Sequence, residues 1–386
     1  MSISIHDLEK RVMTVDAVYK QLEQTEPLTT IEVDASKDVS FHMEPDWAMG
    51  IDALDSTDVV PVTVTIDGTE RRMTKEAINQ AAAAHGLTAP YIKKVPAAHI
   101  ERLLNWHYGA GMGGAAFSLF SVADTISAVT KPTLQPFSNI QLLERAVEGI
   151  QALHGSDVPI FADYKFSNSF LKTNIRLIVP AQERAIEDGF MPDVPDGEED
   201  IWYAGVHLSN SLIGKSQTTL DAYLFRYWCT NGSTTTVKDV GTWHRRVDGQ
   251  QDNVYDWAKD TVEEILGGLE YQFDQVQSLT QLGTGANTGD ILRQIFDDYK
   301  VPVSQRHDIL NTIIEVPTDP TMYHITNAIT MAANDPDMDD KRRDRLMRIG
   351  GAIPTETFDT LKAQVWREGH LAKKDAVNPY EVRPVA

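Results

Sequence analysis

The segment Thr218-Thr-Leu-Asp-Ala-Tyr-Leu-Phe-Arg-Tyr-Trp228 has the alternation that decides the fold. It is rich in aromatic and β-branched residues, which pack well on a pleated surface and favour a strand. Successive side chains of a strand point to opposite faces. The alternation therefore predicts two faces, with Tyr223, Phe225, Tyr227 and Cys229 on one and Leu224, Arg226 and Trp228 on the other.

The same strand composition recurs upstream, in residues 160–166, 174–179 and 201–208. Residues 188–200 hold Pro192, Pro195, Gly197 and a run of acidic side chains, which predicts an exposed loop between strands. The middle of the chain therefore reads as a mainly antiparallel sheet.

Helical patterns surround this sheet. Before it, we expect helices over residues 7–24, 74–84, 97–108 and 142–154, and a hairpin that turns at Asp67-Gly68. After it, apolar residues at spacings of three and four predict helices over 254–279, 290–299, 304–314, 321–333 and 339–349. The sequence therefore predicts an α+β fold with flanking helices and a helical C-terminal third.

We divide the chain into three parts on this basis. Residues 1–70 form an acidic N-terminal segment, 71–250 an α+β core with the central sheet, and 251–386 a helical C-terminal region.

Charge is distributed unevenly over the 386 residues, whose net charge is −21. Residues 1–70 carry 4 basic and 15 acidic side chains, whereas residues 71–180 carry 11 basic and 7 acidic ones. The acidic total argues against a whole-surface affinity for nucleic acid, although the centre is mildly positive. Ordinary surface variation is an alternative explanation of this layout.

The single cysteine, Cys229, excludes an intramolecular disulfide framework and suits a reducing cytoplasm. No apolar run reaches membrane-spanning length, and the N-terminus lacks the layout of a signal peptide. We therefore expect a soluble protein with no membrane partner.

Two nucleotide-binding motifs are present only in part. Gly109–Gly114 fits G-x-G-x-x-G, but it follows a predicted helix and not a strand, so a hinge or packing turn is favoured. Gly214-Lys215-Ser216 resembles the end of a phosphate-binding loop, but Ser209 stands where the first glycine is needed. No histidine or cysteine spacing indicates a metal site, and we expect no cofactor and no catalytic residue.

Aromatic residues alternate with cations from residue 223 to residue 246, a pattern that suits single-stranded nucleic acid. Bases can stack on the aromatic rings while phosphates meet the charges. The candidate contacts are Lys215, Arg226, Lys238, Trp243, Arg245 and Arg246. The alternative is a core strand with an incidental arginine, because aromatic residues in strands are usually packing residues.

One group of motifs resembles a known family. Arg226-Tyr-Trp-Cys229-Thr-Asn231-Gly232, preceded by Asn210-Ser-Leu-Ile-Gly214, is similar to the signature of the phage/plasmid-like proteins of unknown function. Residues 74–96 and the run Asn327-Ala-Ile-Thr330 resemble further parts of that family, so the similarity spans about residues 70–350. The resemblance implies a mobile-element gene expressed in a bacterial host's cytoplasm, and it carries over no catalytic residue.

The signature residues also have a physical interpretation. Asn231-Gly232 permits a left-handed turn, and we expect structural roles for Asn210, Gly214, Asn231 and Gly232. Arg226 can anchor an internal carboxylate or meet a phosphate, and the first role is the more common.

Three functional hypotheses follow. The first is a non-enzymatic, oligomer-forming protein of phage or plasmid DNA metabolism that binds single-stranded nucleic acid. The second is a module that binds a host or phage protein, for counter-defence or regulation, and the third is a structural component of the virion. No residue pattern argues positively for an enzyme.

Overall fold

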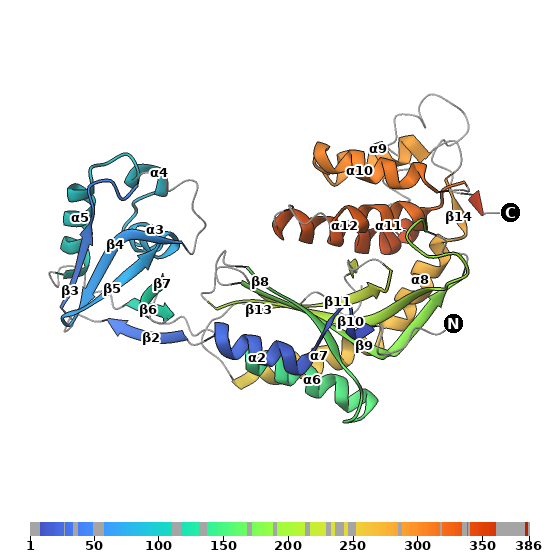
Figure 1. Ribbon diagram of the computed structural model, residues 1–386, viewed down its shortest axis with the longest axis horizontal. Coiled ribbons are helices and arrows are strands. Elements are labelled where there is room, and N and C mark those ends of the chain that lie inside the picture. Colours follow the sequence, from blue (N-terminus) through green and yellow to red (C-terminus); the bar gives the residue numbers. More distant parts are fainter. Residues whose placement is uncertain are drawn as a thin grey trace.

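The computed structural model confirms the α+β class, with antiparallel sheets and a helical C-terminal part. It describes residues 8–26, 28–33, 38–48, 58–109, 117–122, 124–130, 137–167, 172–187, 191–212, 217–228, 233–235, 243–245, 252–284, 288–316, 319–333, 338, 340–359 and 383–384. Figure 1 shows these elements arranged around a smaller sheet and a larger one.

The smaller sheet is built mainly from the first third of the chain. In the described residues it has six strands, in the order β2 (Leu28–Val33), β6 (Phe117–Val122), β7 (Thr125–Thr130), β5 (Thr69–Thr74), β4 (Val59–Ile66) and β3 (Val39–Met43). The hairpin predicted at Asp67-Gly68 is confirmed, and both turn residues have positive φ. The boundary that we predicted at residue 70, between the acidic segment and the core, falls inside β5 of this hairpin.

Helices α3 (Lys75–Ala83), α4 (Ala89–Ile92) and α5 (Ala97–Gly109) accompany the smaller sheet. Thr74 caps α3 as predicted, since its hydroxyl accepts a hydrogen bond from the Ala77 amide. Alternating burial along β3 and β4 places one face of the strands on an apolar core that includes Ala77, Ile78 and Leu104.

The larger sheet follows the central part of the chain. In the described residues its strands run in the order β1 (Met13–Thr14), β8 (Phe161–Ser167), β9 (Lys172–Ile186), β10 (Asp200–Ser211) and β11 (Thr218–Arg226). The short strands β12 (Ser233–Thr235) and β13 (Trp243–Arg245) both pair with β11. All these pairings are antiparallel, as the sequence predicts for the centre of the chain.

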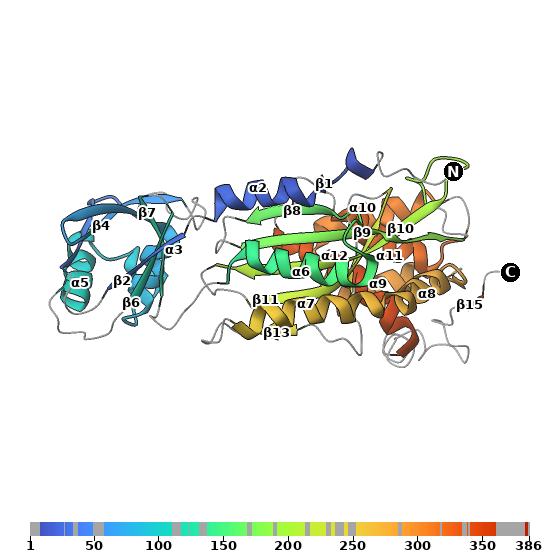
Figure 2. The same ribbon diagram turned by 90° about the horizontal axis from the view of Figure 1, so that it is seen from below.

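Helices cover both faces of the larger sheet. Figures 1 and 2 show α6 (Asn139–His154) and α7 (Asp252–Gly267) on one face, and α11 (Met322–Ala332) and α12 (Asp340–Asp359) on the other. Every residue of β10 and β11 is accordingly buried. The remaining elements of this part are α2 (Val15–Thr25), α8 (Leu269–Leu279), α9 (Thr288–Asp298), α10 (Val303–Ile314), β14 (Leu282–Gly283) and β15 (Arg383–Pro384).

A small apolar contact joins the two sheets. Phe120 and Ala128 of the smaller sheet form a buried cluster with Leu212, which follows β10. Phe166 of β8 packs against the same cluster. The smaller sheet therefore meets the end of the larger sheet at which β8 turns into β9 and β10 turns into β11.

None of the described helices is long and apolar enough to cross a membrane.

Candidate functional site

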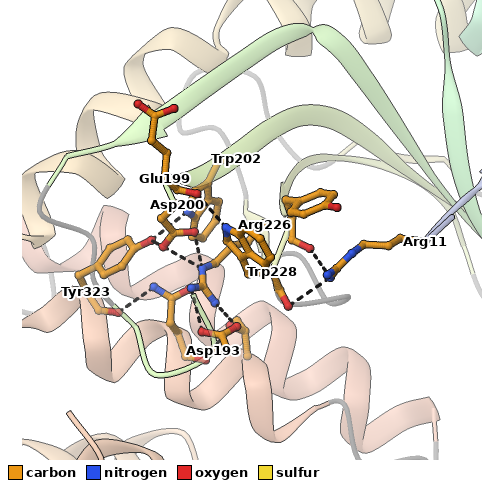
Figure 3. Close-up of polar contacts among 11 residues, drawn as sticks. Arg11, Asp193, Glu199, Asp200, Trp202, Arg226, Trp228 and Tyr323 are labelled. Atoms are coloured by element: carbon orange, nitrogen blue, oxygen red, sulfur yellow. Dashed lines mark hydrogen bonds and ion pairs between the residues drawn. The ribbon is translucent and has the colours of Figure 1, made fainter. Parts of the chain in front are cut away.

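Arg226, the predicted nucleic-acid contact at the end of β11, lies in the interior. Its side chain is 1% exposed, and its Nε donates to both carboxylate oxygens of Asp200 at 2.8 and 2.9 Å. Its two terminal nitrogens form a bidentate pair with Asp193 at 2.7 and 2.9 Å. Figure 3 shows the guanidinium enclosed by these two carboxylates.

Tyr323 of α11 completes this network from the other side. Its hydroxyl donates a short hydrogen bond to Asp200 and accepts one from the indole of Trp202 at 2.9 Å. Burial raises the pKa of Asp200, and the charge of Arg226 opposes that rise. The prediction that Arg226 contacts phosphate is therefore corrected: two aspartates occupy its donors, and it fixes the loop before β10 and helix α11 to the sheet.

Aromatic residues near Arg226 are also held by the protein itself. The Trp228 indole donates to the Glu199 carbonyl at 2.8 Å, and Arg11 donates to the Tyr227 carbonyl at 2.8 Å while lying over the Tyr227 ring (Figure 3). The alternative interpretation, in which the aromatic residues are packing residues of a strand, therefore applies to the end of β11 and the two residues after it.

A second cluster of polar side chains crosses the larger sheet closer to the strand turns. Asp163, Arg176, His207 and Asp221 are direct cross-strand neighbours on β8, β9, β10 and β11. Because directly opposed residues share a face, these four side chains form one line across the sheet, which we name the polar row. Arg176 donates to Asp163 at 3.0 Å, and His207 Nδ1 lies 3.8 Å from the Asp221 carboxylate.

The next residues on the same face, toward the strand turns, are also polar. Asn174, Ser209 and Thr219 are cross-strand neighbours, and all three are buried. The opposite face carries apolar residues, including Leu177, Val206 and Leu208, that join the main core. The face that carries the polar row is therefore polar near the strand turns, whereas farther from the turns it carries buried Ile178, Tyr223 and Phe225.

Helix α12 covers the polar row. A terminal nitrogen of Arg176 contacts the sulfur of Met347 at 2.9 Å, and Met347 and Leu346 are buried. Arg348, the next residue, is exposed. The row therefore lies between the sheet and α12, with an exposed cation beside it.

Burying this many polar groups costs free energy unless each one gains partners. His207 is 3% exposed, and neither of its ring nitrogens has a hydrogen-bond partner in the described part of the chain. The side-chain oxygen of Asn174 is in the same situation. Unsatisfied buried polar groups of this kind call for an explanation, and a ligand-binding role is one.

Burial and positive charge act together on His207. Its pKa is lowered well below the usual value, mainly by burial and then by the charges of Arg176, Lys172 and Arg348. Lys165 lies on the same face, on β8, opposite Asn174. We name Lys165, Lys172 and Arg348, which are all at least partly exposed, the cationic rim.

Other predicted site residues fall in different places. Asn210 is buried and joins β10 to the start of α6, since its amide donates to the Phe137 carbonyl and to Asn139 at 2.8 Å each. Trp243 and Arg245 lie on β13, of which the structure describes only the backbone. The predicted site residues outside the described residues are Gly214, Lys215, Asn231, Gly232, Lys238 and Arg246.

The sequence analysis missed the polar row. Alternating polar residues, as in Lys172-Thr-Asn174-Ile-Arg176, are the signal that could have indicated it. That alternation ordinarily indicates a solvent-facing side of a strand, and only the fold shows that α12 covers it.

Neither a metal nor a known relative identifies the site. Within the described residues, no three His, Cys, Asp or Glu side chains gather closely enough to hold a metal ion. No protein-family model, no curated protein and no solved structure matches the chain.

Proposed function

We propose that this protein binds single-stranded nucleic acid at the cationic rim of the larger sheet. The observation that carries the proposal is the position of three at least partly exposed cations, Lys165, Lys172 and Arg348, beside the polar row, in a chain whose net charge is −21. A local excess of cations in an acidic protein favours an anionic ligand at that one place.

The cations of the rim come from two parts of the fold, the strands of the larger sheet and the helix α12. Lys165 and Lys172 come from neighbouring strands, and Arg348 comes from the helix that covers the sheet. A phosphate backbone carries a repeated negative charge, so one strand of nucleic acid can meet cations from both elements. Lysine and arginine neutralise phosphates and release counterions, which supplies most of the affinity in non-specific binding.

The contacts of the original hypothesis change accordingly. Arg226 is withdrawn, and Lys165, Lys172 and Arg348 take its place. Lys215, Lys238, Trp243, Arg245 and Arg246 stay in the proposal on their sequence pattern. Supporting them, β13 pairs with Thr218–Leu220 of β11, and His244 is the cross-strand neighbour of Thr219.

The biological setting is part of the same proposal. The short motifs shared with the phage/plasmid-like proteins support an accessory protein of a mobile element. Such a protein would act in the cytoplasm of a bacterial host, as a homo-oligomer in DNA metabolism.

An electrophoretic shift with a labelled single-stranded oligonucleotide tests this proposal. We expect a complex at low salt that weakens steeply at moderate salt, because the phosphate contribution falls as salt rises. Absence of any complex at low salt would exclude the proposal, because the electrostatic attraction is strongest there.

A second candidate function is binding to a host or phage protein. Helix α10 supports it, because Val303, Leu310 and Ile314 are 79%, 37% and 77% exposed. Their spacings of seven and four place them on one side of the helix, as an exposed apolar stripe. Recovery of one stoichiometric partner from host lysate, insensitive to nuclease, would favour this function; recovery in purified particles would favour a virion component.

A further inference from the structure

We propose that the smaller sheet is a hinged domain whose pivot is Glu26, and that it swings on this pivot by opening its apolar contact with the larger sheet. This inference concerns a motion of the whole protein and does not depend on the proposed binding of nucleic acid. It stands on the hydrogen bonds of one part-buried carboxylate and on the side chains at which the two sheets meet.

The chain crosses from the larger part of the fold to the smaller sheet and back again. It leaves after α2 and enters β2 at Leu28, and it returns after β7 to begin α6 at Asn139 (Figure 1). Helices α2 and α6 both belong to the larger part, because Leu22 and Leu142 are members of its apolar core. The smaller sheet can therefore rotate about these two covalent connections.

Glu26, at the end of α2, holds the two crossings together. Its carboxylate accepts from the Asn139 amide at 3.0 Å through both oxygens and from the Ile140 amide at 3.3 Å. These amides lie in the first turn of α6, where they have no partner within the helix and where the helix dipole favours a negative charge. The Ser138 hydroxyl accepts from the next amide, that of Gln141, at 3.3 Å. A side chain from the first crossing therefore caps the helix that ends the second.

The start of α6 is in turn fixed to the larger sheet. Asn210 of β10 donates to the Phe137 carbonyl and to the Asn139 side chain, each at 2.8 Å. The hydroxyl of Tyr255 on α7 accepts from the Ser138 amide at 3.2 Å. Glu26 is therefore anchored to the packed part of the larger sheet, and bending of the first crossing begins only after it.

The apolar contact that closes the hinge is small. The buried cluster at which the sheets meet consists of Phe120, Ala128 and Leu212, with Phe166 packed against it. Domains of one chain move relative to each other unless their interface is large and hydrophobic, and a few residues at the ends of elements absorb such a motion. Rotation about Glu26 would separate Phe120 and Ala128 from Leu212 and uncover the strand-turn end of the larger sheet.

Distances between two spin labels on the full-length protein test this hinge. One label is placed on the smaller domain through Arg102→Cys on α5, and the other on the larger domain through Ala152→Cys on α6. Both positions are exposed, and Cys229→Ser removes the native thiol.

We expect the distance distribution to broaden in Glu26→Ala, which removes the pivot, and in Leu212→Ala, which weakens the closing contact. Glu23→Ala, on an exposed position of α2, is the matched control and should leave the distribution unchanged. Labels at Thr69→Cys and Arg102→Cys, both on the smaller domain, should keep one distribution in every variant, because a hinged domain moves as a rigid body.

Three results would overturn the hinge. The first is an equal distribution in Glu26→Ala, Leu212→Ala and Glu23→Ala, and the second is broadening in Leu212→Ala alone, which removes Glu26 as the pivot. The third is broadening between the two labels on the smaller domain, since that sheet would then itself have loosened. Circular dichroism checks the fold of each variant, and Glu26→Gln, which keeps one acceptor oxygen, takes the place of Glu26→Ala if the alanine variant does not fold.

Discussion

At the scale of single residues, the two buried arginines Arg226 and Arg176 differ in their partners. Arg226 is enclosed by Asp193 and Asp200, so its charge is neutralised within the protein. Arg176 pairs with the Asp163 carboxylate, lies beside His207 of the neighbouring strand and contacts the sulfur of Met347. The first arrangement anchors a loop and α11 to the sheet, whereas the second connects β8, β9 and α12.

Replacing Arg226 by methionine should therefore destabilise the fold without a direct effect on the proposed site. Removing one partner of a buried ion pair leaves its carboxylates buried and uncompensated, a cost of about 3–5 kcal/mol. Chemical denaturation of Arg226→Met measures this free energy of unfolding.

Arg184→Met is the matched control for that substitution. Its partner Asp274 is 65% exposed, and ion pairs in solvent contribute about 0–1 kcal/mol. Equal losses of stability in the two variants would contradict the anchoring role of Arg226.

The stability of the protein should also depend on His207 in acid. Its pKa is lower in the folded protein than in the unfolded chain, so the unfolded chain binds a proton first as the pH falls. The contribution of His207 is complete above about pH 6.5, the ordinary pKa of histidine, and is lost as the pH falls toward the lower folded pKa. The loss is at most about 1.4 kcal/mol per pH unit.

Denaturation midpoints at pH 7 and pH 5 check this sign. The wild type should lose more stability between these two values than His207→Gln, because glutamine does not titrate. A larger loss in the variant would show that the folded protein favours protonated His207.

At the scale of elements, one edge of the smaller sheet is covered by a helix. The β3 edge is closed by α5, because Asn105 donates to the Phe41 carbonyl at 2.9 Å and accepts from the Phe41 amide at 2.5 Å. Glu101 accepts from the Met43 amide at 2.8 Å in the same way. The side chains of α5 therefore act as a substitute for a neighbouring strand.

Asn105→Ala should lower the free energy of unfolding by destabilising this edge of the sheet. Two hydrogen bonds to part-buried backbone are lost, for which about 1–3 kcal/mol is expected. Arg102→Ala, on an exposed position of the same helix, is the control and should change the denaturation midpoint little. A midpoint that is the same in both variants would show that the edge does not depend on Asn105.

The elements that could be predicted from sequence are those with strong local periodicity. Helices such as α5 and α10, and the strands β10 and β11, lie close to their predicted ranges. Strands β6 and β7 were missed, because short runs such as Phe117-Ser-Leu-Phe-Ser-Val122 fit a strand and a buried helix equally well. Their place in the sheet depends on pairing with β2 and β5, which are distant in sequence.

The site was less predictable than the fold for the same reason. His207 is isolated in the sequence, and only strand register brings it beside Arg176 and Asp221. The prominent arginine of the sequence, Arg226, is the buried anchor, because loop residue Asp193 pairs with it and Tyr323 of α11 donates to its other partner, Asp200. Such contacts between distant segments are not visible in local patterns.

At the scale of the whole molecule, the contact of Phe120 and Ala128 with Leu212 sets the smaller sheet at the strand-turn end of the larger one. Lys165 and Lys172 are on the strands β8 and β9, which join at that end. A nucleic-acid strand at the cationic rim would therefore lie near the junction of the two sheets, while α10 with its apolar stripe lies beyond α11 and α12 (Figure 1).

The central claim is that the cationic rim holds single-stranded nucleic acid. Its most direct test is the fluorescence anisotropy of a labelled oligothymidylate at low salt, with the wild type, Lys172→Ala/Arg348→Ala, and the control Lys93→Ala/Lys94→Ala directly after α4. We predict that the wild type and the control bind alike, and that the rim variant binds at least about tenfold more weakly with a salt slope smaller by about 1–2. Equal affinity and equal salt slopes in all three folded proteins would contradict the account.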